Sequence, residues 1–130
     1  MIIIGGNEYR IGLIDTFEQL KLARLLSPSL PIVEAIIAER NEEKDLTVPM
    51  MLLLGQLSEE DCEAVVRQCL SSVTRKQSSG WTKVMVNGVI MFSDITLHEM
   101  LQLSSSVITE TLGDFFRTAL SKLKDRAIPE

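Results

Sequence analysis

The chain has 130 residues, 13 of them basic and 18 acidic, which gives a formal net charge of −5. Such an acidic chain lacks the basic face that general binding to nucleic acid or to anionic membranes requires, and its single histidine excludes metal sites that need two or more. The length and a mean hydropathy of +0.18 indicate one domain, residues 1–130, which buries roughly two-thirds of its unfolded surface.

Two β-rich runs, Ile2–Ile4 and Tyr9–Ile14, flank Gly5-Gly6-Asn7, and this pattern predicts an N-terminal β-hairpin. Asp15 or Thr16 should start a helix that runs to about Leu26, and Thr16–Gln19 has the spacing of a capping box that begins on the threonine. Apolar side chains cover most directions around this helix. That distribution favours burial between layers, and a partner-binding face is the alternative.

Ser27-Pro28 should end that helix and begin the next, whose apolar stripe runs from Leu30 to Ile37. A short helix over Met50–Leu54 should follow the restart signal at Thr47–Pro49. The methionine-rich run is ordinary core in one interpretation and an adaptable contact surface in the other.

Ser58 and the acidic residues after it predict the start of another helix, in which Arg75-Lys76 lies at the C-terminal end. Its apolar positions follow helical spacing closely: Cys62, Val65, Val66, Cys69, Leu70 and Val73. The two cysteines would lie about 10.5 Å apart along such a helix. A disulfide needs Cα atoms within about 7 Å, so we expect buried, reduced thiols.

Asn87-Gly88 interrupts the β-rich run Trp81–Phe92 and is typical of a type I′ hairpin turn, after a loop at Gln77–Gly80. The turn sets a register that pairs Val86 with Val89 and Val84 with Met91 on one face, and Met85 with Ile90 and Lys83 with Phe92 on the other. Both faces are apolar. One can pack on the core, whereas the other must be covered by more of this chain, a second subunit or a partner.

Thr96–Glu99 is a further capping box, and it opens a long helix whose apolar stripe runs from Leu97 to Leu123. Gly113 should kink or split that helix, and His98 should be a surface residue in its first turn. Together the elements predict an α+β fold that is mainly α-helical, a small helical bundle with an N-terminal β-hairpin and a second β-hairpin near residues 82–92.

Signals for chemistry are missing from the sequence. There is no phosphate-binding glycine loop and no EF-hand loop, and His98 has no triad partners around a nucleophile elbow. We therefore expect no enzyme activity, no cofactor and no metal. No helix has a basic face for nucleic acid, no run approaches the ~20 apolar residues that span a membrane, and no signal peptide is visible, which indicates a cytoplasmic protein.

What remains is an interaction protein with an excess of aliphatic surface. Six residues of the second hairpin and the long helix are our candidates for partner contacts: Trp81, Met85, Ile90, Phe92, Phe115 and Phe116. The alternative for each of them is an ordinary place in the core.

Several segments also follow one another in a recognisable order. Ile3–Arg10 and Phe17–Pro28 open the series, which continues with Glu60-Asp61, Gln68–Val73, Gly80-Trp81, Met91–Ile95 and Leu112–Phe116. In this order and spacing they resemble the tail assembly chaperones of long-tailed bacteriophages and prophages. The similarity covers most of the chain, and the family has no catalytic motif to transfer.

The resemblance implies a non-enzymatic role in the host bacterial cytoplasm. Such chaperones bind the long, hydrophobic tape measure protein and keep it soluble while tail tube subunits assemble around it, so the tape measure protein is the expected partner and the tail tube protein a further candidate. We also expect self-association. The alternative from another class is a structural minor tail or connector protein that is retained in the virion.

Overall fold

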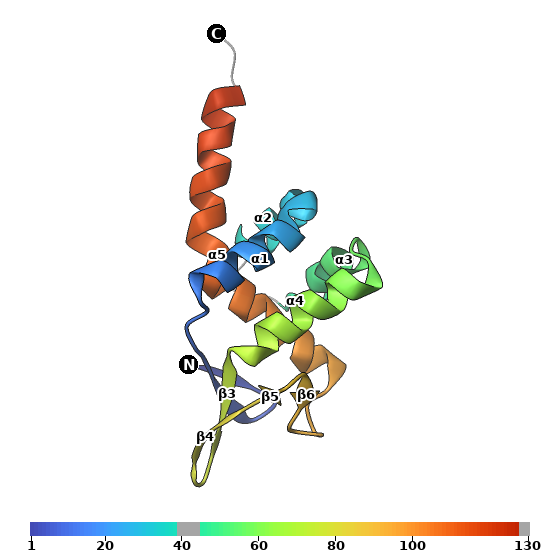
Figure 1. The fold of residues 1–130 in the computed structure, drawn as a ribbon, viewed down its shortest axis with the longest axis vertical. Coiled ribbons are helices and arrows are strands. Elements are labelled where there is room, and N and C mark those ends of the chain that lie inside the picture. Colours follow the sequence, from blue (N-terminus) through green and yellow to red (C-terminus); the bar gives the residue numbers. More distant parts are fainter. Residues whose placement is uncertain (39–44, 128–130) are drawn as a thin grey trace.

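The computed structural model describes residues 1–38 and 45–127, apart from the side chains of residues 120 and 123–127. Strands gather at one end, helices pack in the middle, and the last part of the longest helix projects at the other end (Figure 1). The helices are α1 (Thr16–Leu26), α2 (Leu30–Ala38), α3 (Thr47–Gly55), α4 (Glu59–Ser71) and α5 (Leu97–Ala127), with a 3₁₀ turn η1 at Ser27–Ser29. The strands are β1 (Ile2–Ile4), β2 (Asn7–Ile11), β3 (Val73–Gln77), β4 (Gly80–Lys83), β5 (Met85–Val86) and β6 (Val89–Ile90). The predicted mainly helical α+β class is confirmed.

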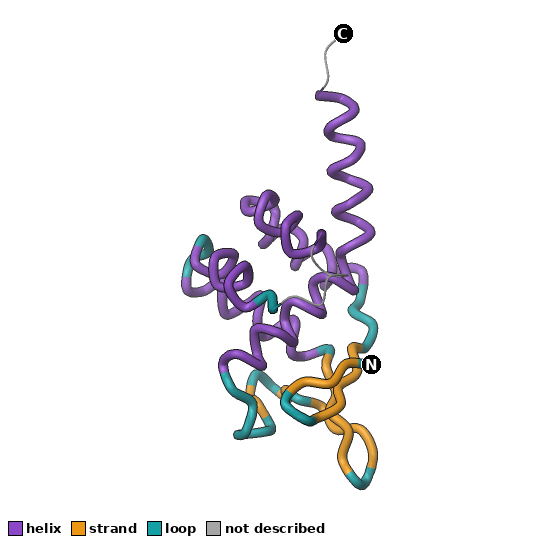
Figure 2. Tube along the Cα trace, turned by 180° about the vertical axis from the view of Figure 1, so that it is seen from behind, coloured by secondary structure: helices purple, strands orange, loops and turns teal. Residues whose placement is uncertain are grey.

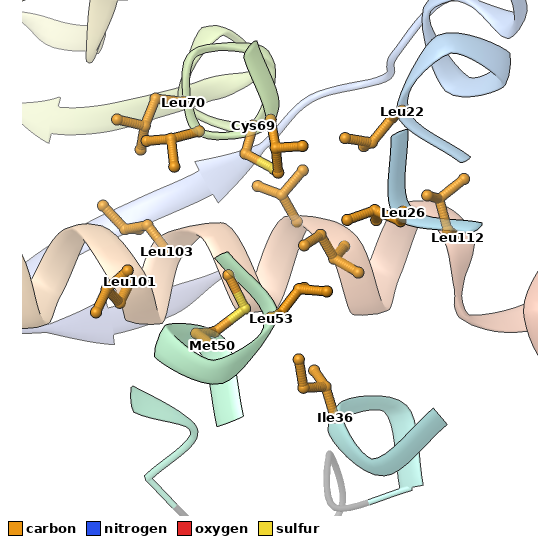
Figure 3. Close-up of a cluster of buried hydrophobic side chains, with 14 of the residues drawn as sticks. Leu22, Leu26, Ile36, Met50, Leu53, Cys69, Leu70, Leu101, Leu103 and Leu112 are labelled. Atoms are coloured by element: carbon orange, nitrogen blue, oxygen red, sulfur yellow. The ribbon is translucent and has the colours of Figure 1, made fainter. Parts of the chain in front are cut away.

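The first half of α5 is the axis of the helical bundle. Side chains of α1, α2, α3 and α4 converge on it, and Figure 3 shows this core around α5. The labelled members of the cluster are Leu22, Leu26, Ile36, Met50, Leu53, Cys69, Leu70, Leu101, Leu103 and Leu112. Each of the four shorter helices therefore buries one apolar side against the same helix, as an amphipathic bundle requires.

Helix α1 begins one residue earlier than the capping box predicts. Asp15 is the cap, because its carboxylate accepts a hydrogen bond from the Phe17 amide at 2.7 Å. The Gln19 side chain folds back toward the start of the helix. Its amide donates a hydrogen bond to the Ile14 carbonyl and accepts none from the Thr16 amide. Only one side of α1 is buried, since Phe17 is 80% and Leu20 is 63% exposed. The prediction that α1 is enclosed between layers is therefore wrong.

The prediction for residues 73–77 is also wrong. Helix α4 starts at its Ser58 cap as expected but ends at Ser71, and Val73–Gln77 forms strand β3 instead of a helix end. This strand joins the N-terminal hairpin to β4 in one antiparallel sheet of order β1-β2-β3-β4. The Gln77–Gly80 segment, predicted to be a loop, is the tight turn between β3 and β4. Val73 fits both a helical stripe and an alternating strand, so local pattern alone does not decide between them.

The Asn87-Gly88 turn is confirmed, because both residues have positive φ, 51° and 78°, as a type I′ turn requires. The predicted pairs Val86–Val89 and Met85–Ile90 are also confirmed, and the Met91 amide bonds the Val84 carbonyl at 2.8 Å.

The predicted pair of Lys83 with Phe92 is wrong. Lys83 belongs to β4 and pairs with Thr74 in the larger sheet. The second hairpin is therefore a short one that covers only residues 85–90.

Arg75 ties the sheet to the start of α5. Its guanidinium makes two hydrogen bonds of 2.8 Å to the Asp94 carboxylate, and it lies 4.4 Å from the centre of the Phe92 ring and 5.9 Å from that of Tyr9. Arg75 is only 8% exposed. A bidentate pair of this kind fixes direction as well as distance, so it sets how the segment before α5 leaves the sheet.

The capping box of α5 is confirmed in both directions. The Glu99 amide donates to Thr96 Oγ1 at 3.2 Å, and the Thr96 amide donates to Glu99 Oε1 at 2.9 Å. The same glutamate covers Gly5 in the first hairpin turn, where φ is +60° and a Cβ would overlap the carboxylate. The N-terminal hairpin and the start of α5 are therefore in direct contact.

Helix α5 is continuous from Leu97 to Ala127, so Gly113 does not split it. Its direction changes near the middle in Figure 1. Besides Gly113, the Ser106 and Thr109 hydroxyls donate to carbonyls four residues earlier, an arrangement that bends helices. The predicted stripe is buried at positions such as Leu101, Val107 and Leu112, whereas the side chains of its last two members lie outside the described part.

We predict that Gly5→Ala destabilises the protein more than Gly6→Ala. Both glycines have positive φ, so both substitutions incur the left-handed backbone cost of about 1 kcal/mol. Only Gly5→Ala also displaces Glu99 from the Thr96 amide, which adds about 0.5–2 kcal/mol. Urea unfolding measures the difference. In a Glu99→Ala background the two glycine variants should become equivalent, and a persisting difference would contradict this mechanism.

We predict that the Arg75–Asp94 pair makes stability depend on acid pH. The hydrogen bonds from Arg75 lower the pKa of Asp94, so the pair contributes stability above the unfolded-state pKa of about 3.9 and loses it as pH falls through the lower folded-state pKa. The melting temperature of Asp94→Asn should therefore lie below that of the wild type at pH 7, and the gap should close in acid. A gap of constant size from pH 7 to pH 3 would refute the prediction.

Candidate interaction surfaces

Two of the six predicted contact residues lie in the core. Met85 of β5 is 5% exposed and Phe116 of α5 is 3% exposed. Both belong to the cluster of buried side chains around α5. They occupy the core position that the sequence left open as the alternative.

Two further predicted residues have their rings covered by arginines of the same chain. The Arg10 guanidinium lies 4.1 Å from the centre of the Trp81 ring, on the face of the sheet away from the helices. Phe92 is covered by Arg75. Both aromatic residues are half-buried, and these cation–π contacts use surface that a partner would otherwise share.

The remaining two predicted residues are exposed, Ile90 by 39% and Phe115 by 57%. The structure does not bring them together. Ile90 belongs to the short hairpin β5–β6, whereas Phe115 lies in the second half of α5. The candidate contact residues therefore divide between two separate surfaces.

The first surface is a groove between α4, the β5–β6 hairpin and α5, here called the hairpin groove. Its volume is about 480 Å³. Its apolar wall is formed by Cys62, Val66, Leu70, Met85, Val89, Ile90 and Met100, and Glu63 and Arg67 stand at its rim. Arg67 holds the hairpin in place through a hydrogen bond to the Gly88 carbonyl. The groove is therefore a formed hollow with a hydrophobic wall, as recognition of an apolar helix requires.

The second surface, here called the α1–α5 face, consists of Phe17, Leu20, Ala23 and Phe115. Two hollows of about 280 and 220 Å³ adjoin it, and both are lined by Leu20, Ala23 and Phe115. These volumes fall below the range of about 300–1,000 Å³ of small-molecule sites. The hollows have the size of spaces for protein side chains.

Sequence reasoning missed several exposed apolar residues near these surfaces. Val89 is 60%, Met91 52% and Leu97 62% exposed. On α3, Met51 and Leu52 are 50% and 58% exposed, although core was the favoured interpretation of that run. The two-faced pattern of the hairpin was a usable signal for Val89 and Met91. For α3 no signal separates the two sides, because the helix is apolar all round.

The polar side chains that the structure describes do not gather into one site. His98 is at the surface, as predicted, with its ring 3.4 Å from an Asp45 oxygen and 3.2 Å from Thr47 Oγ1. Among residues 1–38 and 45–127, no three His, Cys, Asp or Glu side chains gather as a metal site would need. Nor does the described chain contain a helix that is long and apolar enough to cross a membrane.

The two cysteines are free thiols, and the prediction that both are buried holds for Cys69 but not for Cys62, which is half-buried. Complete burial raises the pKa of Cys69 to about 12. Partial burial raises the pKa of Cys62, helped by the negative charges of Glu63 and Glu59. Cys62 lies in the wall of the hairpin groove, whose rim carries both the Glu63 carboxylate and the Arg67 guanidinium.

We predict that Cys69 is inert to thiol reagents in the folded protein. A pKa of about 12 instead of the ordinary thiol value of 9.0 lowers its thiolate fraction near pH 8 by about 1,000-fold. Labelling with iodoacetamide should modify Cys62 slowly and Cys69 only after unfolding in urea. A Cys62→Ser variant isolates the signal of Cys69. Equal labelling rates of that variant with and without urea would show the prediction to be wrong.

A family of known proteins matches most of the chain. The family model described as "Phage tail assembly chaperone protein, TAC" matches residues 5–123. No curated protein and no solved structure matches the chain. The family match spans β2, the second hairpin and nearly the whole of α5, so it includes the hairpin groove and the α1–α5 face. The chain belongs to the phage tail assembly chaperone family.

Proposed function

We propose that this protein is a non-enzymatic chaperone of the host bacterial cytoplasm that binds helical segments of the tape measure protein and keeps them soluble during tail tube assembly. Membership of the tail assembly chaperone family supports the tail assembly role. The observation that carries the finer proposal is the hairpin groove, a hydrophobic hollow of about 480 Å³ beside exposed Val89 and Met91. Helix-in-groove recognition needs such a hollow.

The chemistry of the groove also indicates which segments it prefers. Its apolar wall suits the hydrophobic stripe of an amphipathic helix. Glu63 and Arg67 at the rim carry opposite charges. We therefore infer that the bound segment carries a basic and an acidic residue next to its apolar stripe, because opposite charges at the rim of an interface favour encounter and register.

Co-expression with the tape measure protein of the same phage or prophage tests the proposal. The wild-type chain should increase the soluble fraction of the tape measure protein. Val89→Asp should weaken binding by about 10- to 100-fold, because an exposed apolar side chain that becomes buried contributes about 1.5–3 kcal/mol. Met51→Asp on α3 is the matched control, since Met51 is 50% exposed but lies outside the groove.

Three outcomes decide between the interpretations. Rescue by the wild type and Met51→Asp but not by Val89→Asp supports the groove. Equal rescue by all three would show that the tape measure protein binds outside the hairpin groove. No rescue by the wild type would contradict the chaperone proposal. Iodoacetamide labelling of Cys62 is an independent readout, because a segment in the groove should protect this thiol.

Mass spectrometry of finished virions separates this function from the structural alternative. A chaperone acts before completion of the tail and should be absent from purified particles. A minor tail or connector protein should be present in a fixed ratio to the other tail proteins, and its detection at that ratio would overturn the proposal.

A further inference from the structure

Strand β4 is an edge of the four-stranded sheet, and its outer side has no partner strand within the described chain. Figures 1 and 2 show the β3–β4 hairpin projecting at the end of the molecule opposite the last part of α5. Gly80, Thr82 and Lys83 of β4 are exposed. Unpaired amides and carbonyls along a sheet edge are a template for a further strand, so this edge is able to receive one.

The register of the hairpin determines which backbone groups of β4 point away from β3. The Val84 amide, directly after β4, donates to the Val73 carbonyl at 3.1 Å, which marks a hydrogen-bonded pair. Such pairs alternate with non-bonded pairs along an antiparallel ladder. Thr82 therefore bonds β3, whereas the amides and carbonyls of Trp81 and Lys83 point to the open edge. No further backbone hydrogen bond among residues 1–38 and 45–127 uses these four groups.

The side chains of Trp81 and Lys83 lie on the face of the sheet away from the helices, and this face is basic. The Arg10 guanidinium is held 4.1 Å from the centre of the Trp81 ring, and Lys83 lies in the same row of side chains as Arg10. Neither cation makes an ion pair with a described residue, whereas Lys76 on the same face is paired with Glu8 at 3.5 Å. Two cations are thus left over on a chain with a net charge of −5.

An extended acidic segment of a protein fits both the open edge and the two cations. Its backbone continues the ladder, and its alternate side chains lie on one face of the sheet. Carboxylates at these alternate positions come to lie beside Lys83 and near Arg10. A second copy of β4 would bring further cations to a face that already has two. A nucleic acid has no peptide backbone to continue the ladder, and the acidic chain repels it.

We propose that β4 binds an extended acidic segment of another protein as an additional strand of the sheet, with carboxylates at alternate positions beside Lys83 and Arg10. The backbone groups of Trp81 and Lys83 provide the pairing, and the two cations select the charge of the segment. No residue of β4 lines the hairpin groove. The edge is therefore a second binding site that does not depend on the proposed function of the groove.

The first test uses the purified full chain and a capped synthetic peptide in which Glu and Val alternate. Nuclear magnetic resonance should show binding with a dissociation constant of about 0.1–1 mM. In the free chain the amides of Trp81 and Lys83 should exchange with solvent rapidly, and saturating peptide should slow them at least about 10-fold. The Thr82 amide should be protected in both states. No binding up to about 5 mM peptide, or protection of Trp81 and Lys83 in the free chain, would overturn the proposal.

Modified peptides separate the backbone contribution from the charge. In an added strand, the Glu residues of the peptide direct their amides to β4 and the Val residues direct theirs away. Methylation of the Glu amides should therefore abolish binding, whereas methylation of the Val amides should change it less than about 3-fold. A peptide of the same composition with Glu and Val in separate blocks should bind at least about 10-fold more weakly. Equal binding of all these peptides would rule out an added strand.

Variants of the chain test the position of the site. Lys83→Glu should weaken binding of the alternating peptide by about 10-fold or more. Lys21→Glu is the matched control, because Lys21 is exposed on α1 and the change in charge is the same; it should change binding less than about 2-fold. Lys83→Gln, which only removes the charge, should weaken binding by about 3-fold and decides the outcome if Lys83→Glu fails to fold. Equal effects of Lys83→Glu and Lys21→Glu would contradict the proposed site.

A single-stranded DNA oligonucleotide tests the other class of anionic partner. It should bind more weakly than the alternating peptide at the same salt concentration, and tighter binding of the DNA would overturn the choice of a protein segment. None of these experiments contains the tape measure protein. A failed solubility rescue therefore leaves the β4 site standing, and a failed peptide titration leaves the proposed function standing.

Discussion

The paired guanidinium and carboxylate of Arg75 and Asp94 are the constraint on which the arrangement of the molecule depends. Arg75 lies on the inner face of the sheet, between the rings of Tyr9 and Phe92. Its two hydrogen bonds hold the segment that leads into α5. A buried cation is costly unless it is paired and hydrogen-bonded. The Arg75–Asp94 pair therefore favours one orientation of the start of α5 relative to the sheet. Because α1, α2, α3 and α4 all pack on α5, their positions relative to the sheet depend on this pair as well.

Helix α5 has two different roles along its length. Its first half is enclosed by the other four helices and supplies the centre of the core. Its second half leaves the bundle and displays Phe115 instead of burying it. One continuous apolar stripe thus serves the interior at one end and the surface at the other. The apolar residues behind the positive mean hydropathy of this 130-residue chain are therefore divided between the core and the surface.

The apolar surface of the molecule is divided rather than contiguous. The hairpin groove is walled by α4, α5 and the β5–β6 hairpin, whereas the α1–α5 face involves the middle of α5 and the first helix. Division into two surfaces suits a protein of the tail assembly chaperone family. A chaperone that hides a hydrophobic partner must also keep its own hydrophobic surface from aggregating. In our proposed function the hairpin groove receives the partner.

The sequence by itself determined the features that depend on neighbours along the chain. These include the Thr96–Glu99 capping box, the Ser58 cap, the Asn87-Gly88 turn with its register, and the mainly helical class. Their signals are local because the atoms that satisfy them lie within four residues of one another. The tertiary structure alone decided that Val73–Gln77 is a strand, since its pairing partner in β2 lies about 60 residues away. It also decided which aromatic rings are buried, covered or exposed, because burial is a property of the neighbours that folding supplies and not of the residue itself.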